Sequence, residues 1–519
     1  MRNNYKVLAD DYFGNIMIVC KSLLVGMFAG GIAVIYRIIL TNSEDISLIV
    51  YRFIRHNLIY IPLALAVLCL AGYFVGCLVA KDKMISGSGI PQIEGILRGY
   101  FDQRRRWFVT LLYKFLGGAI AIGAGLSLGR EGPSIQLGAC AAEGLGNRLG
   151  SDRFEKKILM ASGASAGLSA AFNAPMAGVV FALEEIFKYF SPVILLSLMS
   201  AAVAADFISK QVFGLQPIFD FEITKTIPLS SYWILVLLGV ILGLMGALYN
   251  FVLLKTKDLY EKMTFLTVKT RSIIPFVLAG VAGLFFPVIL GAGHQVIAVL
   301  TIQSGIGMLF MILLAKFAFS TISFGSGVPG GIFFPLIVLG ATIGAIFAGV
   351  SIRYFGFSQE LFNNFIVLAM AGYFTAIVRA PITGIVLIME MTGSFSHILP
   401  LTVVAVTAYV IADLVKSPPV YESLLERLIV HEDGEEKEES SKKIVVELIV
   451  KNGSQFGNQR VKSIKWPGNS LLVGVKHGEK QIIPKGDTII KEGDFLTILT
   501  DIHSESHIKE ILSEMNEYP

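Results

Sequence analysis

The sequence predicts a polytopic α-helical membrane protein that ends in a small strand-rich domain. Of its 519 residues, 54% are hydrophobic and only 16% are charged, whereas about a quarter of the residues of a soluble domain are charged. Apolar runs recur through most of the chain, and many exceed the roughly 20 residues that a helix needs to cross a hydrocarbon core. The runs cover residues 14–40, 57–80, 108–128, 159–188, 192–214, 231–254, 272–291, 296–322, 331–352 and 362–416.

The first apolar run and the charged loops indicate how the chain crosses the membrane. The run at 14–40 is longer than the apolar region of a signal peptide, so we expect a retained first helix. The net charge of +4 says little, but its distribution is informative. The segments "KDK" at 81–83 and "DQRRRW" at 102–107 place positive charge in short loops beside apolar runs. Loops of this kind face the cytoplasm in most membrane proteins.

The cysteines predict neither disulfides nor a metal site. All four lie in apolar segments and form no C-x-x-C pair, so we expect them to be small core residues. They are Cys20, Cys69, Cys77 and Cys140. Because the chain also lacks H-E-x-x-H or a similar catalytic constellation, we expect no enzyme, no bound metal and no cofactor.

Near residue 430 the apolar texture stops, and a second, soluble part is predicted. The run "HEDGEEKEESSKK" at 431–443 is charge-dense and has no apolar periodicity, so we expect a solvated linker. The short apolar runs that follow are punctuated by Gly, Asn, Pro and Asp, as in strands joined by turns. The expected strands lie at 444–450, 470–475, 481–484 and 495–499, with a helix at 505–515.

The membrane part contains a weak internal duplication. The segment "GREGPSIQLGA" at 129–139 aligns with "GIFFPLIVLGA" at 331–341, an offset of 202 residues. The segment "NAPMAGVVFALEE" at 173–185 aligns with "RAPITGIVLIMEM" at 379–391, an offset of 206. Two pairs in the same order predict two repeat halves, roughly 14–215 and 230–416. Segments interrupted by Gly and Pro in matching positions of two halves indicate a transport site.

The stretch "LGREGPSIQLGA" at 128–139 predicts a helix start that binds an anion. Proline is favoured in the first turn of a helix, so we expect an irregular approach from Gly129 to Gly132 and a helix from about Pro133. The first N–H groups of a helix are unpaired and carry the positive end of its dipole, and lipid offers them no partner. The carboxylate of Glu131 is an internal anion that can compete with a free anion for these N–H groups. When it is protonated, it loses its charge and can leave the site.

Two further glycine-flanked helix starts lack a carboxylate. In "GSGVPGGIFFP" at 325–335 the N–H groups around Ile332 and Phe333 remain free for a solute anion, and "SGSGIPQIEG" at 86–95 adds the hydroxyl of Ser88. Neutral donors suit transport, because a full charge at low dielectric would hold an ion too tightly to release it. A single glycine-rich break could serve only close helix packing, but three with proline at corresponding places favour an anion path.

Ionisable residues inside the apolar runs are functional candidates. We interpret Lys114 and Arg130 as structural partners or groups that shape the local field rather than as ligands. Glu184 and Glu185 end the run "GVVFALEE", and Glu184 aligns with Glu390 of the second half. We expect these aligned glutamates to cap or pair structurally. Glu185 has an apolar counterpart, and this asymmetry makes it the better candidate for a role such as proton entry.

The motifs "GSGIP", "GREGP" and "GGIFFP", with "PPVYESLL" downstream, resemble those of the CLC chloride channel and transporter family. The resemblance covers about residues 14 to 428. It implies two halves of inverted topology with broken helices, cytoplasmic termini and a multi-pass protein of the cell membrane. It also implies a homodimer in which each subunit has its own pore.

The resemblance further implies particular site residues. The hydroxyls of Ser88 and Tyr421 and two backbone amides would hold a central chloride ion, so the chloride-site positions are Ser88, Gly89, Ile90, Ile332, Phe333 and Tyr421. Glu131 matches the gating glutamate that blocks the outer anion site and carries the proton, and Glu185 matches the inner proton glutamate. Supporting positions are Gly129, Arg130, Gly132, Lys114 and Gly331. One departure is Gln92, where many relatives have an acid.

The tail resembles a different module. Residues 445–501, above all "IIPKGDTIIKEGDFLTIL", are similar to the C-terminal domain of the TrkA or RCK regulatory modules of potassium transport systems. This implies a bacterial protein with a ligand-sensing attachment at 444–519, and a small nucleotide such as cyclic di-AMP is the ligand we expect. The predicted domains are therefore a membrane domain at 1–430, a linker at 431–443 and this regulatory domain.

The function that these observations predict is proton-coupled chloride antiport, with chloride, protons and the membrane as partners and no nucleic acid. The alternative is a passive chloride channel of the same fold, gated by voltage or a ligand. Family exchangers keep a glutamate at the position of Glu185 and most channels have an apolar residue there, so Glu185 argues against a channel. The tail also suggests a third hypothesis, a subunit of a potassium transport system. The sequence contains no "TVGYG"-type selectivity filter, which argues against it.

Overall fold

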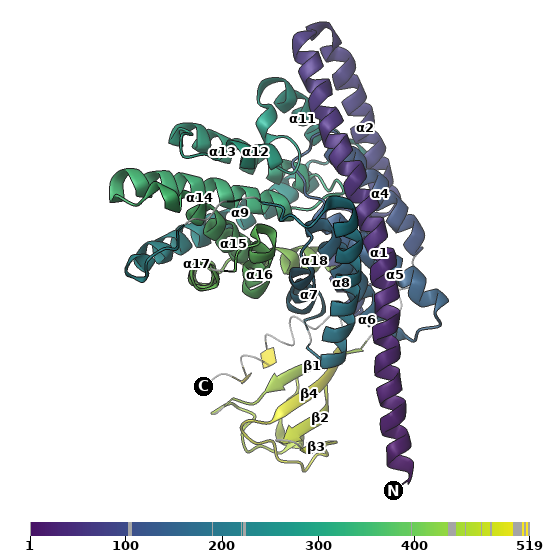
Figure 1. The fold of residues 1–519 in the computed structure, drawn as a ribbon. Coiled ribbons are helices and arrows are strands. Elements are labelled where there is room, and N and C mark those ends of the chain that lie inside the picture. Colours follow the sequence, from purple (N-terminus) through teal and green to yellow (C-terminus); the bar gives the residue numbers. More distant parts are fainter. Residues whose placement is uncertain are drawn as a thin grey trace. The chain divides into compact units, whose positions relative to one another are not determined.

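The computed structural model describes residues 2–101, 106–188, 190–219, 221, 225–395, 397–433, 443–451, 453–468, 470–477, 480–501, 511–512 and 515–516. The chain forms two compact units, Met1–Leu428 and Ile429–Pro519. The first unit is helical and the second contains a small sheet (Figure 1). The predicted fold class, a polytopic helical membrane protein with a small strand-containing domain at the C-terminus, is confirmed.

The first unit contains long apolar helices and several short, interrupted ones. The helices of its first half are α1 (Arg2–His56), α2 (Ile61–Lys81), α3 (Ile90–Arg98), α4 (Trp107–Gly123), α5 (Glu131–Arg148), α6 (Arg153–Phe172), α7 (Pro175–Phe181) and α8 (Pro192–Phe213). A π-helical turn, η3 (Ala182–Phe187), continues α7. Among the described residues, eight helical segments are long and apolar enough to span a membrane. The apolar run at 159–188 is instead broken between α6, α7 and η3.

The second half repeats the first, helix by helix. Its helices are α9 (Tyr232–Lys262), α10 (Val268–Arg271), α11 (Ile273–Phe285), α12 (His294–Val299), α13 (Ile306–Gly325), α14 (Phe333–Phe355), α15 (Phe362–Val378), α16 (Pro381–Thr392) and α17 (Ile398–Leu414). In chain order α1 to α8 correspond to α9 and α11 to α17. A last helix, α18 (Val420–Asp433), follows the repeat.

Close helix packing supports this correspondence. A Cβ atom on Gly26 of α1 would lie 2.3 Å from the carbonyl oxygen of Ala201, so only glycine lets α1 approach α8 there. Glycines at the equivalent places of α9 approach α17 in the same way. The matching contacts are Gly26 with Ala201, Gly30 with Ala205, Gly239 with Thr407 and Gly243 with Ile411. Small residues of this kind allow the close backbone contacts that hold membrane helices together.

Among the described helices that are long enough to span a membrane, α14 and α15 are the most enclosed. In the apolar stretch of 18 residues that could cross a membrane, the buried share is 83% for α14 and 94% for the segment that contains α15. For the segment that contains α2 it is only 28%. Helices buried on every side are apolar all round, as these sequences are. The start of α14 therefore lies inside the protein, where its unpaired N–H groups cannot reach lipid or bulk water.

Two predicted boundaries are wrong by a few residues. Helix α5 begins at Glu131 rather than about Pro133, because proline occupies the third position of the first turn, where its missing N–H is also tolerated. Helix α18 continues through Asp433, so residues 431–433 of the predicted linker are helical. The remainder of that linker, up to residue 442, lies outside the described residues.

The second unit contains a four-stranded antiparallel sheet with the strand order β1-β4-β2-β3. The strands are β1 (Lys443–Ile449), β2 (Leu471–His477), β3 (Lys480–Ile482) and β4 (Phe495–Asp501), close to the predicted ranges. Alternate residues of one face, among them Val446, Leu496 and Ile498, form the core together with Leu512. The helix predicted at 505–515 lies mostly outside the described residues, although 511–512 and 515 are helical.

Candidate anion site

The three glycine-flanked helix starts meet at one place. Gly129 and Gly331 pair through two backbone hydrogen bonds of 2.6 and 2.7 Å, which joins the approaches to α5 and α14. The N–H of Gly330 donates to the carbonyl of Gly87 at 2.9 Å, which adds the approach to α3. Segments far apart in the sequence therefore bring their helix N-termini together, and the predicted supporting residues Gly129 and Gly331 form the junction.

Two buried lysines hold the approach segments in place. The ammonium group of Lys114 donates to the carbonyls of Ile85 and Gly87 at 2.9 and 2.7 Å. Lys316, at the equivalent place of the second half, donates to the carbonyls of two residues at the same distances, Ile289 and Gly291. A buried charge needs such partners, and the predicted supporting residue Lys114 finds them in two carbonyls of the approach to α3.

The lysines reveal a fourth helix start that the sequence analysis missed. The segment "LGAGHQ" at 290–295 precedes α12 and corresponds to "SGSGIP" before α3, with Gly293 in the left-handed region at φ 117° as Gly89 is at φ 90°. It has no proline, and Ala292 stands where the first half has Ser88. The offset of 202 residues that relates Lys114 to Lys316 was the signal that could have found it.

The predicted chloride-site residues lie around this junction. Helix α14 begins at Phe333 with Ile332 as its N-cap, and both residues are fully buried. The hydroxyl oxygen of Ser88 accepts from the N–H of Ile90 at 3.3 Å, so its own proton is left to donate. The buried hydroxyl of Tyr421, on α18, has no hydrogen-bond partner among the described residues. Two hydroxyls and a helix N-terminus thus provide uncharged donors.

Glycines let these donors approach one another. A Cβ on Gly132 would lie 2.8 Å from the Cβ of Ser88, and a Cβ on Gly89 would lie 2.2 Å from the side-chain oxygen of Gln136. Gln136 in turn donates to the carbonyl of Met84 at 2.8 Å. The departing residue Gln92 donates to the carbonyl of Ser86 at 2.7 Å, so it supports the loop from behind the donors.

Glu131 lies at the centre of the junction. Its side chain is fully buried, and a Cβ on Gly129 would lie 2.3 Å from its Oε2, so the carboxylate folds back over that glycine. The backbone N–H groups of Glu131 and Phe334 act on the carboxylate, yet neither oxygen completes a hydrogen bond of normal geometry within the described residues. A carboxylate in this position occupies the ends of two helix dipoles.

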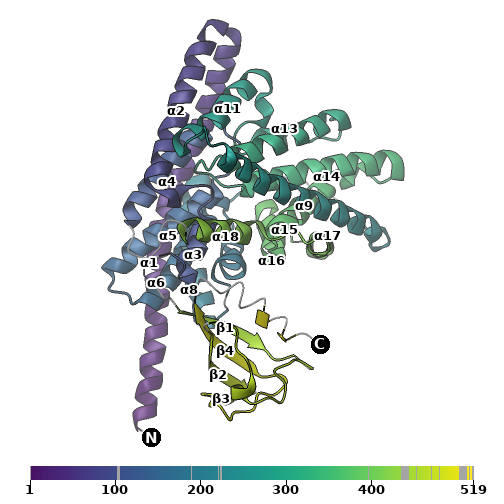
Figure 2. The ribbon, with the colours of Figure 1, turned by 180° about the vertical axis from the view of Figure 1, so that it is seen from behind.

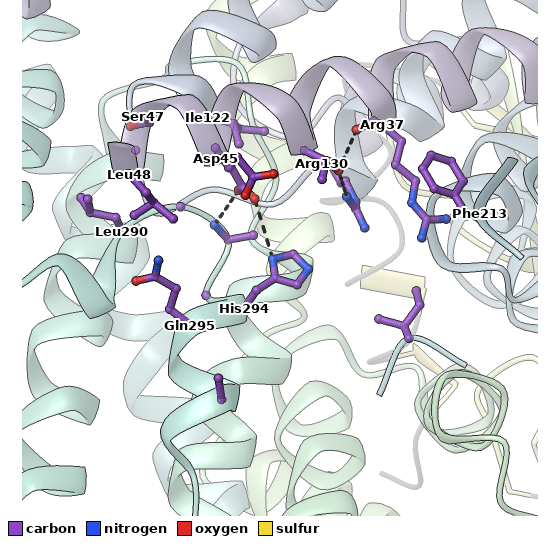
Figure 3. Close-up of a pocket in the computed structure, with 18 of the residues that line it drawn as sticks. Arg37, Asp45, Ser47, Leu48, Ile122, Arg130, Phe213, Leu290, His294 and Gln295 are labelled. Atoms are coloured by element: carbon purple, nitrogen blue, oxygen red, sulfur yellow. Dashed lines mark hydrogen bonds and ion pairs between the residues drawn. The ribbon is translucent and has the colours of Figure 1, made fainter. Parts of the chain in front are cut away.

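Arg130 lines a pocket of about 610 Å³ next to the junction, called the outer pocket below (Figure 3). Its NH1 lies 3.4 Å from the hydroxyl of Thr41, and its Nε lies 3.9 Å from Oε1 of Glu131. Arg37 and Arg130 point into the same part of this pocket. Two cations at the mouth would attract an anion without contacting the buried donors.

A smaller cavity approaches Ser88 from another side. It has a volume of about 30 Å³, enough for one or two waters, and its lining includes Ser86, Ser88 and Lys257. Helices α3 and α18 both contribute to it and lie beside each other (Figure 2). Lys257 is near Arg271 and Arg427, so this side is also basic. Two cavities thus adjoin the donors: the outer pocket beside Arg130, and this smaller one beside Ser88, called the inner cavity below.

The neighbouring residues Glu184 and Glu185 both lie in the π-helical turn η3, but their side chains have different surroundings. Glu184 accepts from the N–H of Thr383 at 2.8 Å and thereby caps α16, whereas Glu390 accepts from the N–H of Ala177 at 2.8 Å and caps α7. This reciprocal exchange explains why the aligned glutamates occur in both halves. Glu185 points inward from η3 and is 4% exposed. π-Helical turns of this kind are frequent at functional sites.

Glu185 is surrounded by further charges that the sequence analysis did not identify. Those that act on it include Lys188, Glu94 and Glu422. Glu94 is fully buried and pairs with Arg98 at 2.8 Å and with Lys188 at 3.1 Å. No sequence signal marked Glu94, because its partners are four and 94 residues away. Among the described residues, no group of three His, Cys, Asp or Glu side chains is placed to hold a metal ion.

Uncharged helix ends that meet inside a multi-pass helical protein define a class of membrane proteins that move anions. A family model described as "voltage gated chloride channel" matches residues 71–413, so the chain belongs to this family, the CLC family of membrane transport proteins. A second model, the TrkA-C domain, matches residues 445–513. The resemblances that the motifs suggested are therefore confirmed for both parts of the chain.

Relatives and solved structures agree with this assignment. The H⁺/Cl⁻ exchange transporter ClcA of Klebsiella pneumoniae (strain 342) is 33% identical over 386 residues, which cover 72% of this chain and 79% of the relative. ClcA of Yersinia pestis bv. Antiqua (strain Angola) is 34% identical over 440 residues, 80% of this chain and 86% of the relative. The crystal structure of a slow cyanobacterial Cl⁻/H⁺ antiporter matches with a TM-score of 0.76 at 28% identity, over 80% of this chain and 99% of that one.

Proposed function

We propose that the protein exchanges chloride for protons across a membrane. The observation that carries this proposal is the pair of buried glutamates whose charges both reach one buried tyrosine. The charges of both Glu131 and Glu185 act on the buried hydroxyl of Tyr421, which is also a proposed chloride ligand. Two carboxylates and an anion site in electrostatic contact allow proton and anion occupancy to depend on each other. The relatives described above are named as exchangers of these two ions.

In the proposed mechanism, chloride enters from the inner cavity or the outer pocket and binds the Ser88 and Tyr421 hydroxyls and the first N–H groups of α14. The deprotonated Glu131 side chain occupies the outer part of this path and excludes a second anion. Protonation removes its charge, so the helix dipoles hold it less strongly and it leaves the path. The anion then passes, and Glu131 returns after it has released its proton to the other side.

The inner proton route begins near Glu185 in this proposal. Glu185 lies on η3, and the charges that act on it are those of Lys188, Glu94, Glu422 and Glu184, so we assign it to the proton route and not to the anion site. A buried carboxyl with one oxygen free of hydrogen bonds can accept a proton from the cytoplasmic side and pass it toward Glu131. The ion pair of Glu94 with Lys188 keeps this inner region polar.

The second candidate function is a passive chloride channel of the same fold. The buried glutamate at position 185 favours the exchanger, because a channel needs no inner proton acceptor. Purified protein in liposomes distinguishes the two. With a chloride gradient imposed and no proton gradient, an exchanger drives protons uphill, whereas chloride flux without proton movement establishes a channel. Glu360→Gln, which removes an exposed carboxylate paired only with Lys225 and Ser358, is the control variant.

We further propose that the protein is a homodimer of a bacterial cell membrane, with both termini in the cytoplasm. The basic loops at 81–83 and near 102–107 support this orientation by the positive-inside tendency. The exposed apolar side chains of α8 and α17, such as Val203, Phe207, Val406 and Val410, would pack against lipid or a second copy. Cross-linking in native membranes, followed by mass determination, tests the dimer.

The C-terminal unit is proposed to pair across the dimer axis and to bind a small cytoplasmic nucleotide such as cyclic di-AMP. One face of its sheet exposes apolar side chains that the strand register places side by side, Val445, Ile449, Leu471 and Phe495. A dimeric membrane domain would hold two such faces at high effective concentration. A ligand alters transport only if it prefers one state of the pore.

Titration of the full-length protein and of a chain that ends at residue 432 with cyclic di-AMP tests this regulation. Binding to the full-length chain alone, with a change in its chloride flux, is the expected result. The opposing interpretation is a passive domain that aids assembly. That interpretation would be established if the full-length protein bound no nucleotide and its chloride flux did not change when nucleotide was added.

A further inference from the structure

The α1 residue Tyr36 has a buried phenol hydroxyl that no protein group satisfies. Its side chain is fully buried, and its hydroxyl has no hydrogen-bond partner among the described residues. Burying a hydroxyl without a partner is unfavourable, and such a group in a native protein usually has a reason. The repeat offers a way to find that reason, because the second half contains the equivalent tyrosine.

Tyr249 of α9 is that equivalent. The spacing that relates Gly26 to Gly239 and Gly30 to Gly243 also relates Tyr36 to Tyr249. Their rings pack on equivalent phenylalanines, Tyr36 on Phe115 with centroids 5.1 Å apart and Tyr249 on Phe317 with centroids 5.2 Å apart. The two tyrosines therefore pack on equivalent phenylalanines, although Tyr249 also packs on Tyr373, whose equivalent in the first half is Gly167.

The hydroxyls differ in their partners. The Tyr249 hydroxyl and the Ser320 hydroxyl are 2.9 Å apart and form a buried hydrogen bond. The residue that corresponds to Ser320 in the first half is Gly118, four residues after Lys114 as Ser320 is four after Lys316. A Cβ on Gly118 would lie only 2.1 Å from the Tyr36 hydroxyl oxygen. The first half thus lacks the serine, and the phenol oxygen occupies the space where a side chain would begin.

The same half contains the proposed gate. The charges that act on the Tyr36 hydroxyl are those of Glu131 and Arg130, and within the described part of the chain neither Glu131 oxygen has a hydrogen-bond partner. In the second half the position of Glu131 is occupied by Phe333, which cannot accept a hydrogen bond. The tyrosine whose hydroxyl has no hydrogen-bond partner among the described residues therefore occurs in the half that contains the gate glutamate. The tyrosine with a serine partner occurs in the half that has phenylalanine at the equivalent position.

We propose that the Tyr36 hydroxyl donates a hydrogen bond to the Glu131 side chain when that side chain leaves the anion path. Tyr36 is then a positioning residue for the gate, and this role rests on the proposed exchange function. A phenol that donates in a dry, low-dielectric site stabilises the displaced carboxyl group. It thereby sets how often the path opens and at what pH the gate titrates.

Other charged groups also influence the gate and must stay constant in any test. Those that act on Glu131 directly are Arg37, Glu44 and Arg130, and His294 and Lys316 act on these neighbours in turn. None of them is altered by a change at position 36 from tyrosine to phenylalanine, because phenylalanine retains the ring and its packing on Phe115. The variant Tyr36→Phe therefore removes the hydroxyl alone.

The experiment compares Tyr36→Phe with the matched control Tyr249→Phe in liposomes. We expect Tyr36→Phe to slow coupled exchange by roughly three- to tenfold, the change that loss of one hydrogen bond produces, and to shift the midpoint of the pH dependence of flux. Its melting temperature should be unchanged or higher, because a buried unpaired hydroxyl is lost. Tyr249→Phe should instead lower the melting temperature, since Ser320 loses its partner, and leave the pH midpoint in place.

A double-mutant cycle with Glu131→Ala tests whether Tyr36 acts through the glutamate. In the Glu131→Ala background, Tyr36→Phe should change passive chloride flux by less than twofold. An equal slowing in both backgrounds would overturn the proposal, because the hydroxyl would then act on the anion itself. A Tyr36→Phe protein with unaltered rate and pH profile would overturn it as well. Neither result concerns the proposed exchange, which fails only if wild-type protein shows no coupled proton movement.

Discussion

The replacement Glu131→Gln removes one negative charge from the junction of the helix ends and changes little else. Glutamine has the shape of the protonated carboxyl group, and the pocket around Glu131 is closed by glycine Gly129 and by α14. The amide cannot bind and release a proton in a cycle. We therefore expect proton movement to fall to the background of empty liposomes, while chloride still binds and crosses the membrane passively.

The size of the effect on chloride binding follows from the geometry. The carboxylate of Glu131 lies near the N-termini of α5 and α14, and a negative charge at a partly buried helix N-terminus is stabilised by up to about 2 kcal/mol. Loss of that stabilisation removes the internal competitor of a second chloride ion. A difference of 1–2 kcal/mol is a factor of roughly 5–30, so chloride affinity should rise by about that factor.

Isothermal titration of detergent-solubilised protein with chloride measures the affinity, and a pH electrode outside chloride-loaded liposomes measures coupling. Glu360→Gln should match the wild-type protein in both assays. Proton antiport at the wild-type level in Glu131→Gln would show that this residue is not the gate. An unchanged chloride affinity would show that the carboxylate does not occupy an anion site.

Further variants test the remaining roles. Glu185→Gln should reduce proton movement at least tenfold and leave chloride affinity within twofold, and the reverse pattern would contradict its role as a relay. Ser88→Pro removes a hydroxyl donor, so the nitrate-to-chloride flux ratio should rise, and an unchanged ratio would show that Ser88 does not tune selectivity. Lys316→Met leaves two buried carbonyls unpaired at about 1–3 kcal/mol each, so thermal unfolding should occur at lower temperature. A melting temperature equal to wild type would contradict the bracing role.

The helix starts of the site could be predicted because their cause is local. Glycine and proline impose backbone preferences on the residues next to them, so "GREGP" and "GSGVPGGIFFP" reveal an approach and a helix wherever they occur. The start before α12 was missed because Gln295 stands where the first half has Pro91. The exact first residue of α5 was also missed, since proline is compatible with several positions of the first turn.

The contacts of the site could not be predicted, because they join residues that are distant in the chain. Glu184 and Glu390 were expected to cap or pair, but the sequence does not say that each caps a helix of the other half. Glu94 pairs with Arg98 of its own helix but also with Lys188, which follows η3 and is 94 residues away. That the Tyr36 hydroxyl lacks the serine partner of its counterpart Tyr249 is known only from the structure, which places Gly118 next to Tyr36 and Ser320 next to Tyr249.

The sequence by itself determined the membrane class, the two-part organisation, the repeat and the family, because hydropathy, composition and short Gly-Pro motifs depend on neighbouring residues alone. Only the tertiary structure decided which donors face one another, which glutamate is a cap and which is buried without a partner, and where a hydroxyl is left unsatisfied. The physical reason is that hydrogen bonds and charge interactions act over a few ångströms in space. Residues such as Gly129 and Gly331 come within that range only after the helices have packed.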